Sequence, residues 1–335
     1  MTRLELQVNT RGLTMRDFAD LARRALRDAG YSMRAAARAT HYDPAYLSRV
    51  LGGKQDPSAR LASALDALVG AGGALAGVVL GDDENERVRH NAANPSRLDA
   101  ATVDALAGVL AAYRRLDDTT RPRSVAPAAV VQQREVTHML RGARGPHRDR
   151  LAEVASEWAQ FSGWLYTQLG DFPRADAHLN KAIAVADDID HGALAAQAHN
   201  LKGNAARKRG QWNAVHRNFM AAYVSESAMR QRVVNGAQTA SALAVLGRRS
   251  EAERLLGEVE DLRDEAAGED PPGTAYWLTP EWLSLPIGHA HLLLGRHARA
   301  ARLLKEGLDS LPLELRYARW TREAREGLAE AEEGA

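Results

Sequence analysis

The chain contains no cysteine among its 335 residues. This absence excludes a disulfide framework and any metal site built on cysteine sulfur. It agrees with a reducing cytoplasm, where we expect the protein to be located. The N-terminal segment MTRLELQVNTRG lacks the apolar stretch of a signal peptide, and the apolar residues 71–81 are too few and too glycine-rich to span a bilayer. We therefore expect no membrane partner.

Alternating runs of β-branched residues are almost missing, while alanine, leucine, arginine and glutamate fill periodic segments. This pattern predicts an all-α protein. Motifs of common enzyme classes are also missing, namely GxSxG, a P-loop, a GxGxxG after a strand, and a His-x-x-x-His with a glutamate. His289, His291 and His297 have no carboxylate pair nearby in the sequence. We expect no enzyme activity, no cofactor and no metal site.

The chain has little net charge, only +1, because 44 basic side chains nearly balance 43 acidic ones. This charge is unevenly distributed, since residues 1–80 hold eleven basic and seven acidic side chains. The remaining chain therefore carries a net charge of −3. A basic N-terminal part on a nearly neutral body indicates a polyanionic partner for that part alone, although the excess is small.

Residues 32–58, SMRAAARATHYDPAYLSRVLGGKQDPS, contain two short helices separated by a tight turn. Ser32 is a good N-cap for a helix over 33–39, and Asp43 is one for a helix over 44–51. Pro44 suits the first helical position, and Gly52-Gly53 ends the second helix. Helices from Thr14 to about residue 29 and from about 58 to 69 are expected on either side.

This segment resembles the Xre/Cro family of helix-turn-helix domains. The family outline is met by Ser32, Ala37, Tyr46, Leu47, Ser48, Arg49, Val50, Gly53 and Pro57. The chain departs from the outline at His41, where the family usually has glycine, and at Leu51, where it often has glutamate. The resemblance implies a DNA-binding domain over residues 1–80 whose second short helix enters the major groove.

Helical periodicity separates the inner and outer faces of the two short helices. Ala36, Ala37, Leu47 and Val50 can pack inward. The opposite face gives the candidate DNA-binding residues Arg34, Ala45, Tyr46, Ser48, Arg49 and Lys54. Arg49 is the candidate for a bidentate contact to guanine and Ala45 for a thymine methyl group, while Arg34, Arg38 and Lys54 suit phosphates. The alternative is an ordinary helical bundle with solvated arginines.

After a predicted linker over 81–97, helices are expected over about 98–116 and 126–141, and the chain then repeats itself. Four segments, 164–183, 203–222, 240–259 and 288–307, share one outline. Each has a turn glycine, a small or β-branched residue five positions later and a bulky apolar residue nine positions later. The outline resembles the tetratricopeptide repeat, in which pairs of antiparallel helices stack. Residues 98–335 are thus predicted to form a tetratricopeptide-like α-solenoid for sensing, dimerisation or both.

Stacked helix pairs of this kind expose the first helix of each pair on a concave side. Candidate ligand-binding residues there are Gln160, Trp164, Gln197, Asn200, Asn204 and His289, with Gln168, Arg207 and Trp282 at related places. Asparagine offers both a donor and an acceptor, so it can hold an extended peptide backbone. The alternative is that the polar residues simply face water and the tryptophans belong to the core.

The order of an Xre-type reader and a repeat region resembles the peptide-sensing regulators of Gram-positive bacteria and, still more, actinobacterial regulators with this arrangement. The resemblance implies a transcriptional regulator that binds double-stranded DNA as a homodimer. A short signalling peptide, as in quorum sensing, or a small molecule would modulate it. An interaction scaffold with a weak or vestigial DNA-binding domain is the alternative.

Overall fold

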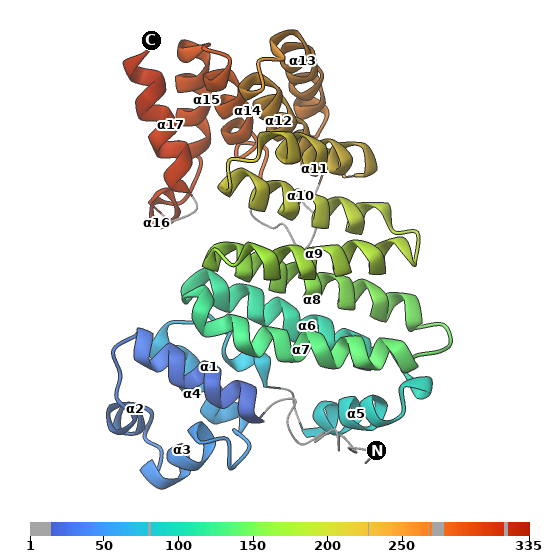
Figure 1. Cartoon of the computed structure of the whole chain (residues 1–335). Helices are drawn as coiled ribbons and strands as arrows, with labels where there is room; N and C mark the ends of the chain where they lie inside the picture. Colours follow the sequence, from blue (N-terminus) through green and yellow to red (C-terminus); the bar gives the residue numbers. More distant parts are fainter. Residues whose placement is uncertain (1–14, 80–81, 227, 267, 270–277, 318–320) are drawn as a thin grey trace. The chain divides into compact units, whose positions relative to one another are not determined.

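The computed structural model describes residues 15–79, 82–226, 228–266, 268–269, 278–317 and 321–335. Throughout these ranges the secondary structure is helical, with no strand (Figure 1). The all-α prediction is therefore confirmed: an N-terminal helix-turn-helix domain is followed by consecutive packed helical hairpins. The predicted cap Thr14 lies outside the described residues.

The N-terminal domain consists of α1 (Met15–Asp28), α2 (Met33–Thr40), α3 (Pro44–Leu51) and α4 (Ala59–Val69). Ser32, Asp43 and Ser58 each accept a hydrogen bond from a backbone N–H in the first turn of the following helix. These side chains satisfy donors that no helical carbonyl can reach, so they fix where the helices begin. The sequence-based boundaries of these helices agree with the structure to within one or two residues.

Asp66 on α4 organises the turn that follows the domain. Its carboxylate is 5% exposed and accepts hydrogen bonds from the backbone N–H groups of Gly73, Leu75 and Ala76 at 2.7, 2.6 and 3.0 Å. Several donors compensate the cost of burying this polar group. The turn leads into the short 3₁₀ helix η2 (Ala76–Val78), which packs against α6.

The segment predicted as a linker is structured. Residues 82–97 contain α5 (Asp82–Ala93) and the 3₁₀ turn η3 (Pro95–Arg97). Val88 and Asn91 of α5 are buried, and Asn91 Nδ2 donates to Thr102 Oγ1 at 2.6 Å. A single buried valine in a polar segment gives no helical period in the sequence, which explains why α5 was not predicted.

The next two helices, α6 (Ala100–Thr119) and α7 (Pro122–Gly142), begin the C-terminal hairpins. The sequence predicted a pause over DDTTRPRSVAP, residues 117–127, and a second helix from about residue 126. Instead Pro122 occupies the start of α7 and Pro127 lies inside the helix. Proline has no N–H, so Pro127 leaves the carbonyl of Arg123 without its usual helical donor.

Helix α1 packs on α7 at this irregular turn. Arg24 Nη1 donates to the carbonyl oxygen of Arg123 at 2.6 Å, which supplies the donor that Pro127 lacks. One turn away, Ser124 Oγ donates to Asp28 Oδ2 at 3.0 Å. These contacts join the helix-turn-helix domain to the first hairpin of the repeat region.

The predicted repeats correspond to four helical hairpins: α8 (Arg148–Leu169) with α9 (Phe172–Asp187), α10 (Gly192–Lys208) with α11 (Trp212–Ser225), α12 (Met229–Val245) with α13 (Arg249–Ala266), and α14 (Ser284–Leu293) with α15 (His297–Asp309). The turn glycines Gly170, Gly210, Gly247 and Gly295 all have φ between 67° and 76°. This left-handed conformation favours glycine, so the glycine spacing located every hairpin. Their assignment to the tetratricopeptide repeat stays a prediction.

Within three of the hairpins a glycine seven residues before the turn lets the two helices approach closely. A β-carbon added at Gly163 or Gly203 would lie 2.6 Å from Leu179 or Phe219 respectively. At Gly288 the corresponding distance to Leu304 is 2.9 Å. Each bulky residue is the one nine positions after the turn glycine, so the repeated outline is a pair of interlocking positions.

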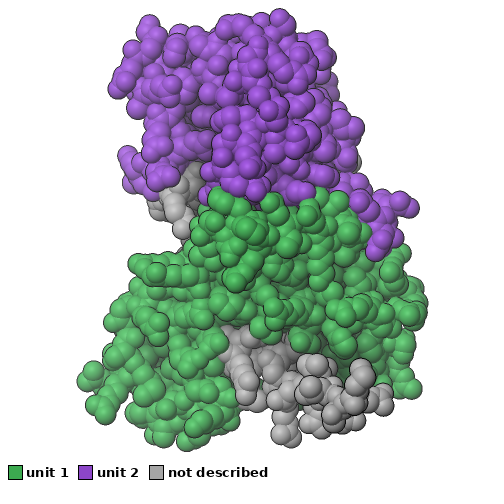
Figure 2. Space-filling model, in the orientation of Figure 1, with its two compact units in different colours: residues 1–185 green, residues 186–335 purple. Residues whose placement is uncertain are grey.

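Contacts divide the chain into two compact units, residues 1–185 and 186–335 (Figure 2). The first unit holds the helix-turn-helix domain together with α5 to α8 and most of α9. The second holds the remaining hairpins and ends in α16 (Leu313–Arg316) and α17 (Arg322–Glu333). Helix α17 packs on α15 through Leu328 and Ala331.

Candidate nucleic-acid interface

The turn between α2 and α3 has the backbone of a helix-turn-helix, although His41 replaces the usual glycine. His41 has φ 57° and ψ 30°, and its N–H contacts the carbonyl oxygens of Ala37 and Arg38. The substitution therefore leaves the left-handed geometry in place and adds only the strain of a side chain there. After it, Asp43 Oδ1 accepts from Tyr46 N at 2.8 Å and starts α3.

Helix α3 has one fully buried face and one exposed face. Leu47 and Val50 are 0% exposed, as the sequence predicted, and they pack with Ala36 and Ala37 of α2. Ala45, Ser48 and Arg49 are exposed on the other side. The short side chains of Ala45 and Ser48 leave the helix backbone accessible, so a surface such as a base edge can approach it closely.

Arg49 is oriented by a residue that the sequence reasoning missed. Its Nε donates to Gln55 Oε1 at 2.9 Å, which leaves the terminal guanidinium nitrogens without a protein partner among the described residues. The sequence signal for this contact is a glutamine in the turn after α3. Glutamine is too common in such turns for its presence alone to predict a contact with Arg49. The contact restricts the guanidinium before any partner binds.

Tyr46 does not project freely from α3. Its ring is half-buried against the core and lies 5.8 Å from the Tyr42 ring, and its hydroxyl accepts from Ser58 N at 3.3 Å. The tyrosine thus ties the first turn of α3 to the start of α4. A contact of its hydroxyl with DNA remains a prediction, but its ring has a packing role that the sequence reasoning did not assign.

The cations around α3 are unpaired. Arg34, Arg38 and Lys54 are exposed, and none of them forms a salt bridge with any residue that the structure describes. Unpaired cations beside an exposed helix give the positive surface that phosphate groups require.

The candidate ligand residues on α8 lie in packed surroundings. Gln160 is 3% exposed, and its Nε2 is 3.4 Å from Ser156 Oγ. Trp164 is half-buried and its Nε1 donates to Asp117 Oδ2 of α6 at 3.0 Å. Trp164 therefore links α8 to α6, whereas the contact of Gln160 with Ser156 stays within α8.

The candidates on α10 form a polar cluster with α12. Gln197, Asn200 and Asn204 are half-buried. Asn200 Nδ2 donates to Oδ1 of Asn235, a residue of α12 with 0% exposure that the sequence reasoning missed. Three buried polar atoms here have no hydrogen-bond partner among the described residues: Asn204 Oδ1, Asn235 Nδ2 and Gln238 Oε1.

His289 on α14 belongs to an ionic cluster that also involves α17. Its Nε2 lies 3.6 Å from Glu323 Oε1, and Arg207 of α10 forms a salt bridge with the same carboxylate. Burial lowers the pKa of His289, while Glu323 acts in the opposite direction. His289 Nδ1 is buried without a partner, like the three atoms of α10 and α12. Three of the hairpins in the second unit thus present partly unsatisfied polar groups.

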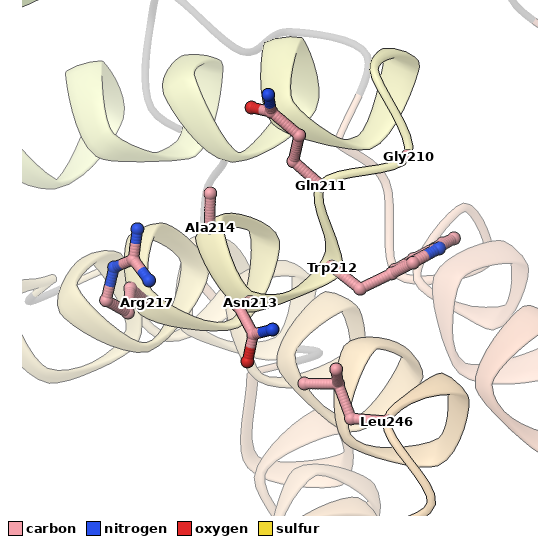
Figure 3. A pocket seen from close by; sticks show the side chains of 7 residues that line it. All are labelled: Gly210, Gln211, Trp212, Asn213, Ala214, Arg217 and Leu246. Carbon is pink, nitrogen blue, oxygen red and sulfur yellow. The ribbon is translucent and has the colours of Figure 1, made fainter.

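A separate hollow lies at the turn between α10 and α11 (Figure 3). Its lining includes Trp212, Asn213 and Arg217, and Leu246 at the end of α12 completes it. Asn213 and Arg217 are exposed, so this hollow has no buried polar group that would select a ligand. Within the described ranges, no three histidine or acidic side chains gather to hold a metal, and no helix is long and apolar enough to cross a membrane.

Comparison with protein families identifies the N-terminal part. A family model described as a helix-turn-helix domain matches residues 17–77, which contain α2, α3 and α4 and nearly all of α1. The match ends just before α5 and covers none of the helical hairpins. No curated protein matches the chain.

Proposed function

We propose that the protein is a sequence-specific DNA-binding transcriptional regulator that reads DNA with α3. The observation that carries the proposal is the exposed face of α3, where Ala45, Ser48 and Arg49 lie opposite a fully buried face. An α-helix fits the major groove, and an oriented guanidinium can donate two hydrogen bonds to guanine. The helix-turn-helix match over residues 17–77, which includes α3, supports this role of the helix.

Arg34, Arg38 and Lys54 contribute affinity rather than sequence preference in this proposal. Phosphate contacts position a protein on the duplex and make binding depend on salt, whereas base contacts select the sequence. One such domain reads only a few base pairs. We therefore propose that two copies bind two half-sites about one helical turn apart, as a homodimer.

The test compares Arg49→Ala with a variant that removes the same charge elsewhere in the domain. A duplex is first selected with the wild-type protein from random sequences, and affinities for it and for random DNA are measured by fluorescence anisotropy at several salt concentrations. Arg49→Ala should lose about 1–3 kcal/mol on the selected duplex and relax the preference at one position. Arg23→Ala on α1 is the control, because Arg23 is exposed and pairs only with Asp20 in the structure. A wild-type protein without preference over random DNA would support the scaffold alternative.

We further propose that the second unit binds a modulating ligand at the polar cluster of α10, α12 and α14. Asn204 Oδ1, Asn235 Nδ2, Gln238 Oε1 and His289 Nδ1 are buried with no hydrogen-bond partner in the described part of the chain. Each such atom costs free energy that a ligand could recover. Because both donors and acceptors are present, a ligand with alternating N–H and C=O groups, such as a short extended peptide, suits the cluster best.

A peptide library displayed on phage and selected on the immobilised full-length protein tests this ligand class. We expect enriched peptides whose binding is lost in an Asn204→Ala, Gln238→Ala variant. An Asn213→Ala variant, altered in the exposed hollow, should retain binding. Enrichment that is equal for all three proteins would refute the assignment of the ligand to this cluster.

A further inference from the structure

Two helices of the first unit carry an excess of positive charge on a shared outer surface. On α7, Arg134 and Arg141 lie one turn on either side of Thr137, and on α9, Arg174, His178 and Lys181 lie at positions i, i+4 and i+7. Lys181 Nζ donates to Thr137 Oγ1 at 3.0 Å, so the two rows face each other. We call these five residues the basic rows; burial and the neighbouring cations lower the pKa of His178, so the positive charge comes from the other four.

The charge of the basic rows is poorly neutralised by the protein. Arg134 and Arg141 are exposed and form no salt bridge with any residue that the structure describes, and Lys181 contacts a hydroxyl instead of a carboxylate. Burial lowers the pKa of Lys181, and so do Arg141 and Arg134. Of the five, Arg174 alone forms an ion pair, with Asp171.

The rows are held in a defined shape by aromatic contacts. The His178 ring stacks on Tyr166 of α8 at 5.3 Å with an interplanar angle of 11°. The Arg174 guanidinium lies over the same tyrosine ring at 5.4 Å. Arg174 and His178 are thus ordered before a partner binds, so these two side chains lose little entropy on binding.

Straight operator DNA is a poor occupant for this surface. Helix α1 contacts both α3 and α7, so α1 separates the proposed DNA-reading helix from α7. An anionic partner must therefore come from elsewhere.

The chain itself contains a helix with the complementary pattern. Helix α17 buries Gly327 and Ala331 and exposes Glu326, Glu330 and Glu333 at positions i, i+4 and i+7. Seven residues span about 10 Å along a helix, so the ends of this acidic row match the Arg134–Arg141 and Arg174–Lys181 separations. Glu323, one turn earlier, is already engaged by Arg207 and His289, and Glu326 pairs with the exposed Arg322 at 3.7 Å.

We propose that α17 of a second copy docks along the basic rows, and that this reciprocal contact forms the homodimer. Each copy offers both the rows and the acidic helix, so two copies can form the same contact twice. Exposed ion pairs add little affinity each but set orientation and register. The dimer therefore forms at micromolar or higher concentration, weakens with salt, and is strengthened when two half-sites hold both copies. This inference deepens the proposed dimeric reader, but its test needs no DNA.

Charge reversal with mutual rescue tests the contact in the full-length protein. Two double variants are compared with the wild type by analytical ultracentrifugation. One carries Arg134→Glu and Lys181→Glu, and the other carries Glu330→Lys and Glu333→Lys. Each should raise the dimer dissociation constant roughly tenfold or more. An equimolar mixture of the two variants should form a heterodimer, and the fourfold variant should recover the homodimer. Arg254→Glu on α13, an exposed reversal outside both rows, should change nothing.

Because the chain has no cysteine, introduced cysteines report the contact directly. A mixture of Arg141→Cys and Glu330→Cys proteins should form an oxidised heterodimer faster than either pairs with itself. A wild-type protein that stays monomeric at every concentration of a 100-fold dilution series, starting from the solubility limit, would overturn the proposal. A dimer whose dissociation constant is unchanged by both double variants would also overturn it. So would variants that change the sedimentation of the monomer and leave the dissociation constant unchanged. Circular dichroism identifies a variant that fails to fold, and the cysteine pair, which reverses no charge, then tests the contact in its place.

Discussion

Replacing Gly203 by alanine should destabilise the α10–α11 hairpin, although alanine is the better helix former. In an open helical position the change from glycine stabilises by about 0.5–1 kcal/mol. At Gly203 the new β-carbon would lie 2.6 Å from two atoms of the Phe219 ring. Phe219 is 2% exposed and packs with Val215, so its ring has no free space to enter. Overpacking of this kind costs about 1–3 kcal/mol, and we expect a net loss of roughly 1–2 kcal/mol.

Gly257 provides the matched control for this prediction. It lies inside α13, is exposed, and has no atom within 4 Å of an added β-carbon. Gly257→Ala should therefore raise stability by about 0.5–1 kcal/mol. Urea denaturation followed by far-ultraviolet circular dichroism should move the two midpoints in opposite directions. A Gly203→Ala protein as stable as the Gly257→Ala protein would refute the interlocking positions as the basis of the repeats.

Three further changes probe other parts of the structure. His41→Gly should stabilise the helix-turn-helix domain by about 1 kcal/mol in urea denaturation, because glycine adopts the left-handed turn without strain; an unchanged midpoint would show that the side chain compensates. Arg24→Ala should weaken the packing of α1 on α7 by about 1 kcal/mol or more, seen as faster amide exchange in α1, since the Arg123 carbonyl loses its donor; equal exchange rates would contradict the contact. For Glu260, burial acts to raise the pKa, but hydrogen bonds with Arg299 and His291 outweigh it and lower the pKa below the ordinary glutamate value of 4.5. Folding thus favours the ionised carboxylate, so Glu260 contributes to the free energy of unfolding above pH 4.5 and loses this contribution as the pH falls through its lowered pKa. Glu260→Gln should therefore flatten the acid side of a curve of stability against pH. An unchanged acid side would refute the assignment.

Residues with strong local preferences allowed much of the fold to be predicted from sequence. Ser32, Asp43 and Ser58 act through a hydrogen bond to their own helix, so their effect does not depend on distant residues. The four turn glycines similarly reflect a backbone conformation that few other residues adopt. Helix α5 and the early start of α7 depend instead on tertiary contacts. Asn91 and Arg24 each satisfy a group on another helix, and a sequence pattern does not contain that information.

Only the part of the candidate site that depends on local sequence preferences could be predicted. The exposed face of α3 follows from helical periodicity, which placed Leu47 and Val50 inside. The link from Arg49 to Gln55 and the packing of Tyr46 under α4 depend on a turn whose path the sequence did not specify. In the second unit, Asn235 and Gln238 lie on a helix whose residues were not considered, because the repeat outline identifies the turn and not the facing polar positions.

The union of α1 with α7 bears on how this protein could be re-engineered. A chimera joined near residue 80 would keep the family-matched segment but would strip Arg24 and Asp28 of their counterparts on α7. A helix-turn-helix domain cut there would expose the surface of α1 that normally packs on α7, and its solubility would fall. The natural fusion point lies near residue 185, where the contacts divide, so the portable module is more than twice as long as the family-matched segment.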